Sequence, residues 1–187
     1  MVMDSSDNEI LDIVDEEDRV LGQISRRDAH SQNVLHRSVH IIVLDKDNKI
    51  FVQERSRSKD SYPGFFEVSL SGHVLQGESY MQAASRELRE ELGVDVQKSI
   101  VRDSFSRSFL QPVRMFNFHL QTPQENELVT VFLIKNFEGT ITVNRQEVFA
   151  GKFLSLPEFM QDFASKKEKY TPGSIKAWDT YKVNFMK

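Results

Sequence analysis

The sequence of 187 residues predicts an α/β protein in which helices cover both faces of a mixed β-sheet. Strand-like runs come before, between and after one strongly amphipathic helix, and this arrangement is typical of such a sheet. Two further helical segments near the end of the chain provide helices for a second face.

The first elements are a hairpin and a short helix. Residues 10–14 and 19–24 are strand-like runs on either side of an acidic turn at 15–18. Residues 25–31 are expected to form a short helix capped by Ser25. We therefore divide the chain into an N-terminal hairpin extension, residues 1–35, and a main domain of residues 36–187. The hairpin leaves a strand edge with which a second subunit could pair, so a homodimer is compatible with the sequence.

The central part alternates strands with the strongest helix. Strands are expected at 38–44 and 49–55, joined by the polar turn 45–48, and residues 65–70 are expected to be extended. In residues 79–92, the side chains of Met81, Ala84, Leu88 and Leu92 form one apolar stripe at helical spacing. Gly93 follows at the position of a C-cap glycine.

The remaining elements are further strands of the sheet and the two helices expected on its second face. Strand-like runs occur at 100–109, 113–121 and 128–136, with another around 147–154. Pro157 opens an expected helix over 157–167, and a last helix is expected over 172–183.

Composition excludes several classes of protein. Residues 1–30 carry a net charge of -6 and the other 157 carry +2, which gives the total of -4, and no dense basic face for nucleic acid is visible. The absence of cysteine excludes a disulfide scaffold, an iron–sulfur cluster, a zinc ribbon and a cysteine nucleophile. It also suits a reducing compartment, so we expect a cytoplasmic protein. No apolar run approaches the length of a membrane span, so we expect no membrane association.

The stretch from Gly72 to Val94 carries the chemistry. Glu87 and Glu91 are one helical turn apart, and Glu90 lies on the same side. Three carboxylates so close repel one another unless a cation lies between them, and Mg²⁺ is the hard cation that carboxylate oxygens prefer. Such a cation also binds phosphate oxygens and activates water.

The flanking residues favour a site over an ordinary charged helix face. Glu78 and Arg86 are eight residues apart and can pair to anchor the loop onto the helix. Gly72 would let the loop backbone approach the metal. The alternative is a solvated face with Glu–Arg pairs, but glycines at both ends and the fixed Glu78-to-Arg86 spacing argue against it.

These residues match the whole of the Nudix box, so the chain resembles the Nudix hydrolases. The resemblance implies an α/β/α sandwich around a mixed sheet. It also implies hydrolysis of a nucleoside diphosphate linked to another group, or of a related diphosphate, with Mg²⁺ or Mn²⁺. By this resemblance Glu87, Glu90 and Glu91 would bind the metal and one of them could act as base, Arg86 would orient a carboxylate, and Glu78 would brace Arg86. Gly72 and Gly93 are the glycines of the motif.

A second resemblance extends over roughly residues 10–180. The chain is similar to the type I isopentenyl diphosphate isomerases at the segments 36–39, 53–56, 58–59, 63–66, 71–73 and 125–127. By this resemblance a second, transition-metal site would use His36, His73, Glu125 and Glu127. His30 matches a further ligand, although its spacing to His36 is one residue shorter than in those enzymes. Arg55 and Lys59 would bind the diphosphate.

One departure from the isomerases decides between the two activities. The isomerases use a cysteine directly before the Gly-His pair as an acid/base group, and here this position is Ser71, with no evident neighbouring base. The complete Nudix box also favours a hydrolase, so the chain resembles most the isomerase-like Nudix hydrolases. An isopentenyl diphosphate isomerase is the alternative. A non-catalytic module that senses nucleotides is a further alternative, against which the intact Glu87, Glu90 and Glu91 argue.

Overall fold

The computed structural model describes residues 9–98, 100–102 and 107–186. Its elements in chain order are β1 (Ile10–Val14), β2 (Val20–Ser25), α1 (Arg26–Ser31), β3 (His36–Asp45), β4 (Ile50–Arg55), β5 (Phe66–Val68), β6 (Leu70–His73), α2 (Tyr80–Leu92), β7 (Ile100–Arg102), β8 (Arg107–Phe109), β9 (Val113–Gln121), β10 (Asn126–Phe137), β11 (Val148–Leu154), α3 (Leu156–Ser165), the 3₁₀ turn η2 (Lys167–Lys169) and α4 (Pro172–Phe185). Within these residues, no helix has the length and apolar character that crossing a membrane requires.

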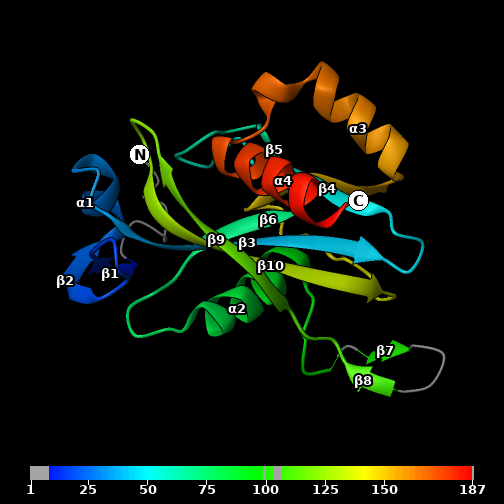
Figure 1. The fold of residues 1–187 in the computed structure, drawn as a ribbon, viewed down its shortest axis with the longest axis horizontal. Coiled ribbons are helices and arrows are strands. Elements are labelled where there is room, and N and C mark those ends of the chain that lie inside the picture. Colours follow the sequence, from blue (N-terminus) through cyan, green and yellow to red (C-terminus); the bar gives the residue numbers. More distant parts are fainter. Residues whose placement is uncertain (1–8, 99, 103–106, 187) are drawn as a thin grey trace.

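A mixed sheet forms the centre of the molecule. In the described part of the chain it has nine strands, with β11, β4, β3, β1 and β2 in sequence across it. β10 runs parallel to β3 and antiparallel to β9, while β5 and β6 pair with β4 and β3. Helix α2 lies on one face, and α3 and α4 lie on the other (Figure 1). The predicted α/β/α arrangement is confirmed.

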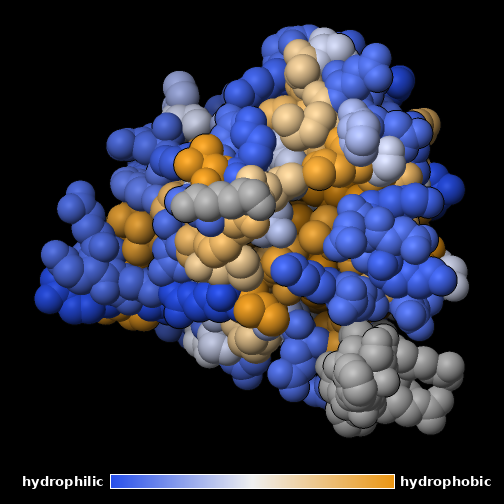
Figure 2. All heavy atoms as spheres, turned by 45° about the vertical axis from the view of Figure 1, so that its right-hand side comes forward, coloured by the Kyte–Doolittle hydropathy of each residue, from blue (hydrophilic) through white to orange (hydrophobic). Residues whose placement is uncertain are grey.

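Alternating side chains of the central strand supply both hydrophobic cores. Ile41 faces the α2 side and packs with Leu88 and Leu92. The next residue, Ile42, faces the opposite side and packs in a cluster with Trp178 of α4 and Phe159 of α3. The face shown in Figure 2 is mainly hydrophilic, with a band of hydrophobic atoms across it.

Helix α2 begins and ends at the residues that the sequence predicts. The Ser79 side chain accepts a hydrogen bond from the Gln82 backbone N–H, and the Gln82 side-chain oxygen accepts one from the Ser79 backbone N–H, forming a capping box. Gly93 ends the helix in the left-handed conformation, with φ of 66°.

The predicted apolar stripe was wrong at one position. The Met81 side chain is 43% exposed. Tyr80, one residue earlier, packs against the core in its place. The helix is therefore rotated slightly from the orientation that the apolar periodicity alone suggests, and Ala83 is buried beside Ala84.

The other predicted elements agree with the structure except at 65–70, where one extended segment was expected and two strands, β5 and β6, pair with β4 and β3, and at 100–109. The hairpin, the Ser25-capped helix α1, and the later strands and helices are confirmed within one to three residues. The run at 100–109 was expected to be one strand, but β7 and β8 form an antiparallel pair, and residues 103–106 lie outside the described residues. Strand propensity is the same in one long strand and in two paired short ones, so it could not distinguish them.

The hairpin extension belongs to the same sheet. Ile13 of β1 pairs with His36 of β3, and Leu11 is fully buried. The boundary at residue 35 stays a prediction.

Candidate active site

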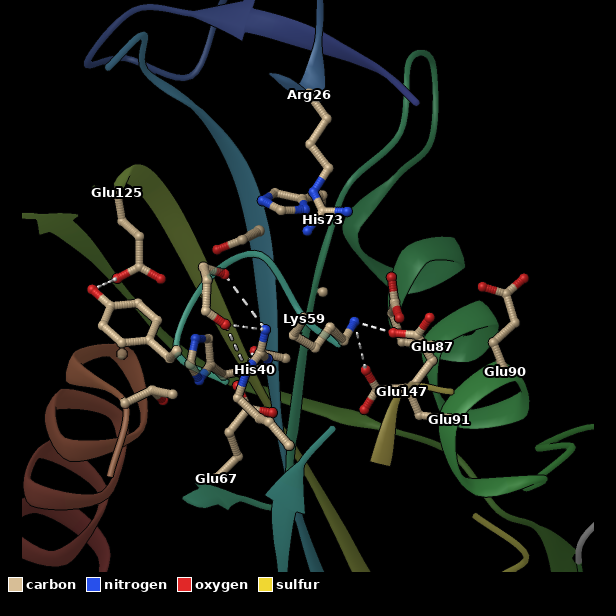
Figure 3. Close-up of a pocket in the computed structure, with 18 of the residues that line it drawn as sticks. Arg26, His40, Lys59, Glu67, His73, Glu87, Glu90, Glu91, Glu125 and Glu147 are labelled. Atoms are coloured by element: carbon tan, nitrogen blue, oxygen red, sulfur yellow. Dashed lines mark hydrogen bonds and ion pairs between the residues drawn. The ribbon is translucent and has the colours of Figure 1, made fainter. Parts of the chain in front are cut away.

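A cavity of about 280 Å³ opens between α2 and the sheet ends, and most residues of the predicted site line it; His36, Glu78 and Gly93 are not among its lining residues. Figure 3 shows Glu87, Glu90 and Glu91 projecting from α2 on one side. His73 and Arg26 lie at a second side, and Glu125 and His40 lie opposite α2.

Two of the three box glutamates are buried together. Glu91 is 3% exposed, and the Glu87 side chain is 12% exposed. Burial and the neighbouring Glu91 charge raise the pKa of Glu87 to about 8. Burial, aided by Glu67, raises the pKa of Glu91 to about 7, although Lys59 opposes this. A cation between the two carboxylates would remove this cost, so their surroundings fit a divalent metal ion.

The Glu90 carboxylate lies at the mouth of the cavity. Its side chain is 49% exposed, and one of its oxygens accepts a hydrogen bond from Arg86 Nη1 at 3.2 Å. It is therefore available to a cation at the open side of the pair formed by Glu87 and Glu91.

Arg86 joins the predicted parts of the motif. Its Nε and Nη2 donate to the two carboxylate oxygens of Glu78 at 2.9 Å, and its Nη1 donates to Glu87 at 2.6 Å. Nη2 also donates to the His73 carbonyl at 2.8 Å, which ties α2 to β6. The two contacts that we expected for Arg86 are present.

Gly72 has a different role from the one that we predicted. It lies in β6 rather than in a loop, opposite Glu87. A Cβ atom at this position would overlap the Glu87 carboxyl group. Gly72 therefore makes room for the Glu87 side chain.

The two predicted phosphate-binding cations have different surroundings. Arg55 is buried, donates to Glu67 at 2.9 Å and also holds the Ser61 carbonyl. Lys59 Nζ lies 3.9 Å from Glu91 Oε1 and forms an ion pair with Glu147 (Figure 3). Lys59 thus stands beside the box glutamates, while Arg55 is held on the far side of the cavity floor.

A buried network under the cavity was not predicted. Gln53 and Glu67 are cross-strand partners in β4 and β5. Gln53 Nε2 donates to Glu67 at 3.0 Å and to Glu91 at 2.9 Å. Ser71 Oγ donates to Glu67 at 2.8 Å, so the expectation that Ser71 has no neighbouring base was wrong. Burial acts to raise the pKa of Glu67, but Arg55 and Gln53 hold it below its ordinary value, which makes Glu67 a weak base.

Strand pairing assembles a second cluster of possible metal ligands. His36 pairs with Glu127 across the parallel β3–β10 ladder, and Ser38 pairs with His73 across β3 and β6. Helix α1 adds His30, whose Nε2 lies 3.0 Å from His73 Nε2. Ligand atoms of His30, His36, His73 and Glu127 all lie within 4.8 Å of one another.

The donor atoms of this cluster suit a transition metal. His36 Nδ1 donates to the Val34 carbonyl at 2.8 Å, so its buried Nε2, which has no hydrogen-bond partner among the described residues, carries the lone pair. Burial lowers the pKa of His73 to about 3, which keeps this imidazole neutral. Burial opposes the charged form of Glu127, yet the imidazoles of His36 and His73 hold its pKa well below its usual range. Imidazole nitrogens beside an ionised carboxylate fit such an ion.

The predicted members of the second site are not all brought together. His36, His73 and Glu127 are close, and His30 joins them despite its short spacing because it lies in α1. Glu125 is not among the four residues of the cluster, and its carboxylate accepts a hydrogen bond from Tyr62 Oη at 3.2 Å. Burial and the charge of Glu127 raise the pKa of Glu125 to about 8.

The sequence contains weak signals for the residues that we missed. Glu67 is a charged residue inside the apolar run Phe66–Val68, and this position could have indicated a buried role. His40, which lies between Val39 and Ile41 in β3, gives the same signal, whereas Glu147 carries none. Glu147 reaches the site because the Asn144 backbone donates to the Glu91 carbonyl at 2.8 Å, which places the 144–147 turn beside α2.

Comparison with known proteins agrees with this geometry. The family model of the NUDIX domain matches residues 34–174. An uncharacterized Nudix hydrolase from Yersinia pestis is 44% identical over 46% of this chain and 47% of its own. Isopentenyl-diphosphate Delta-isomerase 1 of Photorhabdus laumondii is 29% identical over 89% of this chain and 90% of its own. The crystal structure of DR0079 from Deinococcus radiodurans has a TM-score of 0.65 and 26% identity, covering 84% of this chain and 90% of that one. The chain spans about half the length of the first curated relatives that it matches.

Proposed function

Because this chain belongs to the Nudix domain family, we propose that it is a metal-dependent hydrolase of a nucleoside diphosphate derivative or a related diphosphate. The observation that carries the proposal is the buried pair Glu87 and Glu91, braced by Arg86 and Glu78 at the wall of the cavity. A non-catalytic nucleotide sensor has no need to bury two repelling carboxylates.

The motif residues and the two cations beside them have distinct roles in the proposed reaction. Glu87, Glu90 and Glu91 would hold Mg²⁺ or Mn²⁺, and Arg86 fixes the position of Glu87. The metal ion supplies positive charge for the diphosphate and lowers the pKa of water. Lys59 lies where it can contact a phosphate oxygen, and Arg55 stiffens the cavity floor through Glu67. In the reaction, the water oxygen forms a new bond to phosphorus, the bridging P–O bond breaks, and the water proton passes to a carboxylate.

The second cluster supports a second divalent ion. We assign His30, His36, His73 and Glu127 to a transition-metal site, because a buried imidazole nitrogen in it carries a lone pair without a hydrogen-bond partner. The resemblance to the isomerases implies the same site, so the cluster also favours the alternative activity. The surroundings of Ser71 argue against an isomerase, because the Ser71 hydroxyl donates a hydrogen bond to the carboxylate of Glu67, which is a weak base.

The partners and location that we expected belong to the same proposal. The substrate is a small diphosphate, and neither nucleic acid nor membrane is expected to bind. A cytoplasmic location rests on the cysteine-free composition. A homodimer could form through the edge strand β2, where Val20 and Leu21 are 52% and 67% exposed, and light scattering of the purified protein would test this.

The proposed function is tested with a panel of diphosphates and one variant. Purified protein is incubated with nucleoside diphosphate compounds and Mg²⁺ or Mn²⁺, and release of phosphate or monophosphate is followed. Glu91→Gln should reduce turnover at least on the order of a hundredfold, because a neutral amide binds the cation weakly. The fold should be retained, since the change relieves repulsion and Gln53 can still donate to the amide oxygen.

The matched control is Glu168→Gln, a change in an exposed glutamate of η2 that lies outside the cavity. It should leave turnover unchanged. Equal turnover and metal dependence for Glu91→Gln and wild type would contradict the assignment.

A further inference from the structure

The cavity wall has an unusual composition for a small-molecule site. Such sites are usually lined mainly by apolar and aromatic side chains. Here the lining residues that the structure describes are polar or glycine, and Tyr62 carries the one benzene ring among them. A prenyl chain would find little apolar surface in this cavity, and Tyr62 offers a nucleobase the one benzene ring of the described lining.

The half of the cavity opposite α2 presents mainly hydrogen-bond acceptors. Tyr62 Oη donates to Glu125 at 3.2 Å, and Ser71 Oγ donates to Glu67 at 2.8 Å. Ser38 Oγ donates to Glu127 at 2.6 Å. Each hydroxyl proton is thus used within the wall, while the hydroxyl and carboxylate oxygens keep free lone pairs. A ligand there must bring donors.

His40 gives a second, independent indication of a ligand. It lines the same half of the cavity, is 3% exposed, and its Nδ1 has no hydrogen-bond partner among the described residues. The Cε1–Nε2 edge of its ring faces Gly173, where an added Cβ would lie 2.6 Å from Cε1. Gly173 therefore lets the imidazole ring pack directly against the backbone at the start of α4.

This half of the cavity lies next to the box glutamates. One amide nitrogen, Gln53 Nε2, donates to both Glu67 and Glu91. A group attached to a phosphate that lies near Glu91 would therefore reach Glu67 and its neighbours directly. The Arg55 guanidinium offsets the charge of the Glu67 carboxylate, so this place suits neutral hydroxyl groups.

We infer that Ser38, His40, Tyr62, Glu67, Ser71 and Glu125 form a subsite for a hydroxyl-rich group, a sugar or polyol, carried by the diphosphate. This inference rests on the proposed hydrolase function and narrows its substrate class. Hydroxyl groups donate to the carboxylates and accept from the imidazole, and a buried site that pairs with hydroxyls rejects analogues that lack them. If a nucleobase is also attached, it is expected to lie outside the cavity.

The test compares matched diphosphates with one scissile bond. The probes are ribose 5-diphosphate, 2-deoxyribose 5-diphosphate, isopentenyl diphosphate and adenosine 5′-diphosphate, each with Mg²⁺. We expect kcat/KM for ribose 5-diphosphate to exceed that for the deoxy compound by about tenfold, and that for isopentenyl diphosphate by at least about a hundredfold. Adenine should change kcat/KM by less than about threefold. Titration calorimetry with the methylene-bridged analogues should give the same order of affinity.

A pair of tyrosine variants tests whether the Tyr62 hydroxyl belongs to the subsite. Tyr62→Phe removes the hydroxyl bonded to Glu125 and should bring the ribose-to-deoxyribose ratio close to one. Tyr80→Phe is the matched control, because Tyr80 Oη also bonds a carboxylate, that of Asp18 at 3.1 Å, but Tyr80 does not line the cavity. This control should keep the wild-type ratio.

The outcomes distinguish a failure of the proposed subsite from a failure of the proposed hydrolase function. Hydrolysis of all four probes at similar kcat/KM would overturn the subsite and leave the hydrolase intact. A preference for isopentenyl diphosphate, or a large gain from adenine, would overturn it as well. If no probe is hydrolysed but the analogues bind in the expected order, the proposed function fails and the subsite stands. Equal affinity of all the analogues would overturn the subsite in that case too.

Discussion

Glu87 and Glu91 face one cavity from successive turns of α2, and both are largely removed from water. Burial disfavours the charged form of each group, and the two charges also repel one another. Without metal, ionisation of these two carboxyl groups therefore destabilises the folded state, and a divalent cation can offset this effect. This effect gives the site a pH dependence whose direction can be derived.

The unfolding free energy of the metal-free protein should fall as pH rises. The pKa values of Glu87 and Glu91 are raised from 4.5 to about 8 and about 7, so between these limits the folded state binds more protons than the unfolded chain. This contribution is fully present below about pH 4.5 and is lost as pH rises to about 8. Tm measured in a chelator at pH 5.5, 7 and 8.5 should decrease by several degrees in total.

Adding Mg²⁺ at pH 8.5 should restore Tm, because the cation binds the ionised carboxylates. Glu91→Gln supplies the control, since it leaves one buried carboxyl group and should flatten the decrease. A Tm that rises steadily with pH in the chelator would contradict the argument.

The residues of the motif could be predicted from the sequence, whereas the residues outside the motif that contact them could not. Arg86 and Glu78 are recognisable because both lie in one short segment with helical spacing. Glu67, His40 and Glu147 reach the site through strand register and a turn, and a single sequence does not specify register directly. The prediction of His30 was weakened by its spacing to His36, although a residue on a separate helix need not keep the spacing that a continuous strand imposes.

Local signals fixed the ends of α2 but not its rotation. Gly93 acts within a few residues of its own position, so the preference for a C-cap glycine identified the end of the helix. The choice between Tyr80 and Met81 as the core residue depends on the sheet that the helix covers, and that information is not local.

Gly93→Ala should destabilise the protein more than Gly77→Ala. Both glycines have positive φ, 66° and 72°, so both changes carry a backbone cost of about 1 kcal/mol. At Gly93 the new Cβ would also lie 3.1 Å from the Thr142 carbonyl oxygen, whereas nothing lies within 4 Å of it at Gly77. Thermal or denaturant unfolding of both variants measures the difference. Equal loss would show that the Thr142 segment moves aside at no cost.

The strand ladders that join β10, β3 and β6 make a metal-content prediction. If His30, His36, His73 and Glu127 form the second site, purified protein should contain near-stoichiometric Zn²⁺, Mn²⁺ or a similar ion. The double variant His36→Ala with His73→Ala should lose this ion by elemental analysis while keeping most of its hydrolysis with Mg²⁺. His119→Ala is the control, because His119 lies in β9 and bonds Asn126 instead. No bound metal after these ions are supplied would contradict the site.

At the scale of the whole molecule, the sequence predicts the layers of the fold. The order of strands and helices predicts a mixed sheet covered on both faces, because few topologies satisfy that order. The parallel pairing of β3 with β10 was beyond prediction, since ninety residues separate His36 from Glu127 and no local feature links them. That pairing nevertheless brings the imidazoles and the carboxylate together.

The same frame is found in chains named as hydrolases and as an isomerase, so overall similarity does not choose between the activities. The choice depends on whether a proton can be exchanged with carbon. Isomerisation requires one group to protonate carbon and an opposing group to deprotonate it. Glu127 could serve as one of them, and position 71 should supply the other.

Ser71 cannot readily do so. A hydroxyl has a pKa far above neutral pH, and its partner Glu67 is a weak base because Arg55 and Gln53 stabilise its charged form. We therefore expect no measurable exchange of deuterium from solvent into isopentenyl diphosphate, even with Mg²⁺ and Mn²⁺ or Zn²⁺ present. Exchange registers a single half-reaction, so it detects the activity more sensitively than product formation does. Clear exchange by the wild-type protein would promote the isomerase above the hydrolase. A trace of exchange gained by Ser71→Cys, against none for the wild type, would show that the frame still positions the substrate and that the missing thiol separates the two reactions.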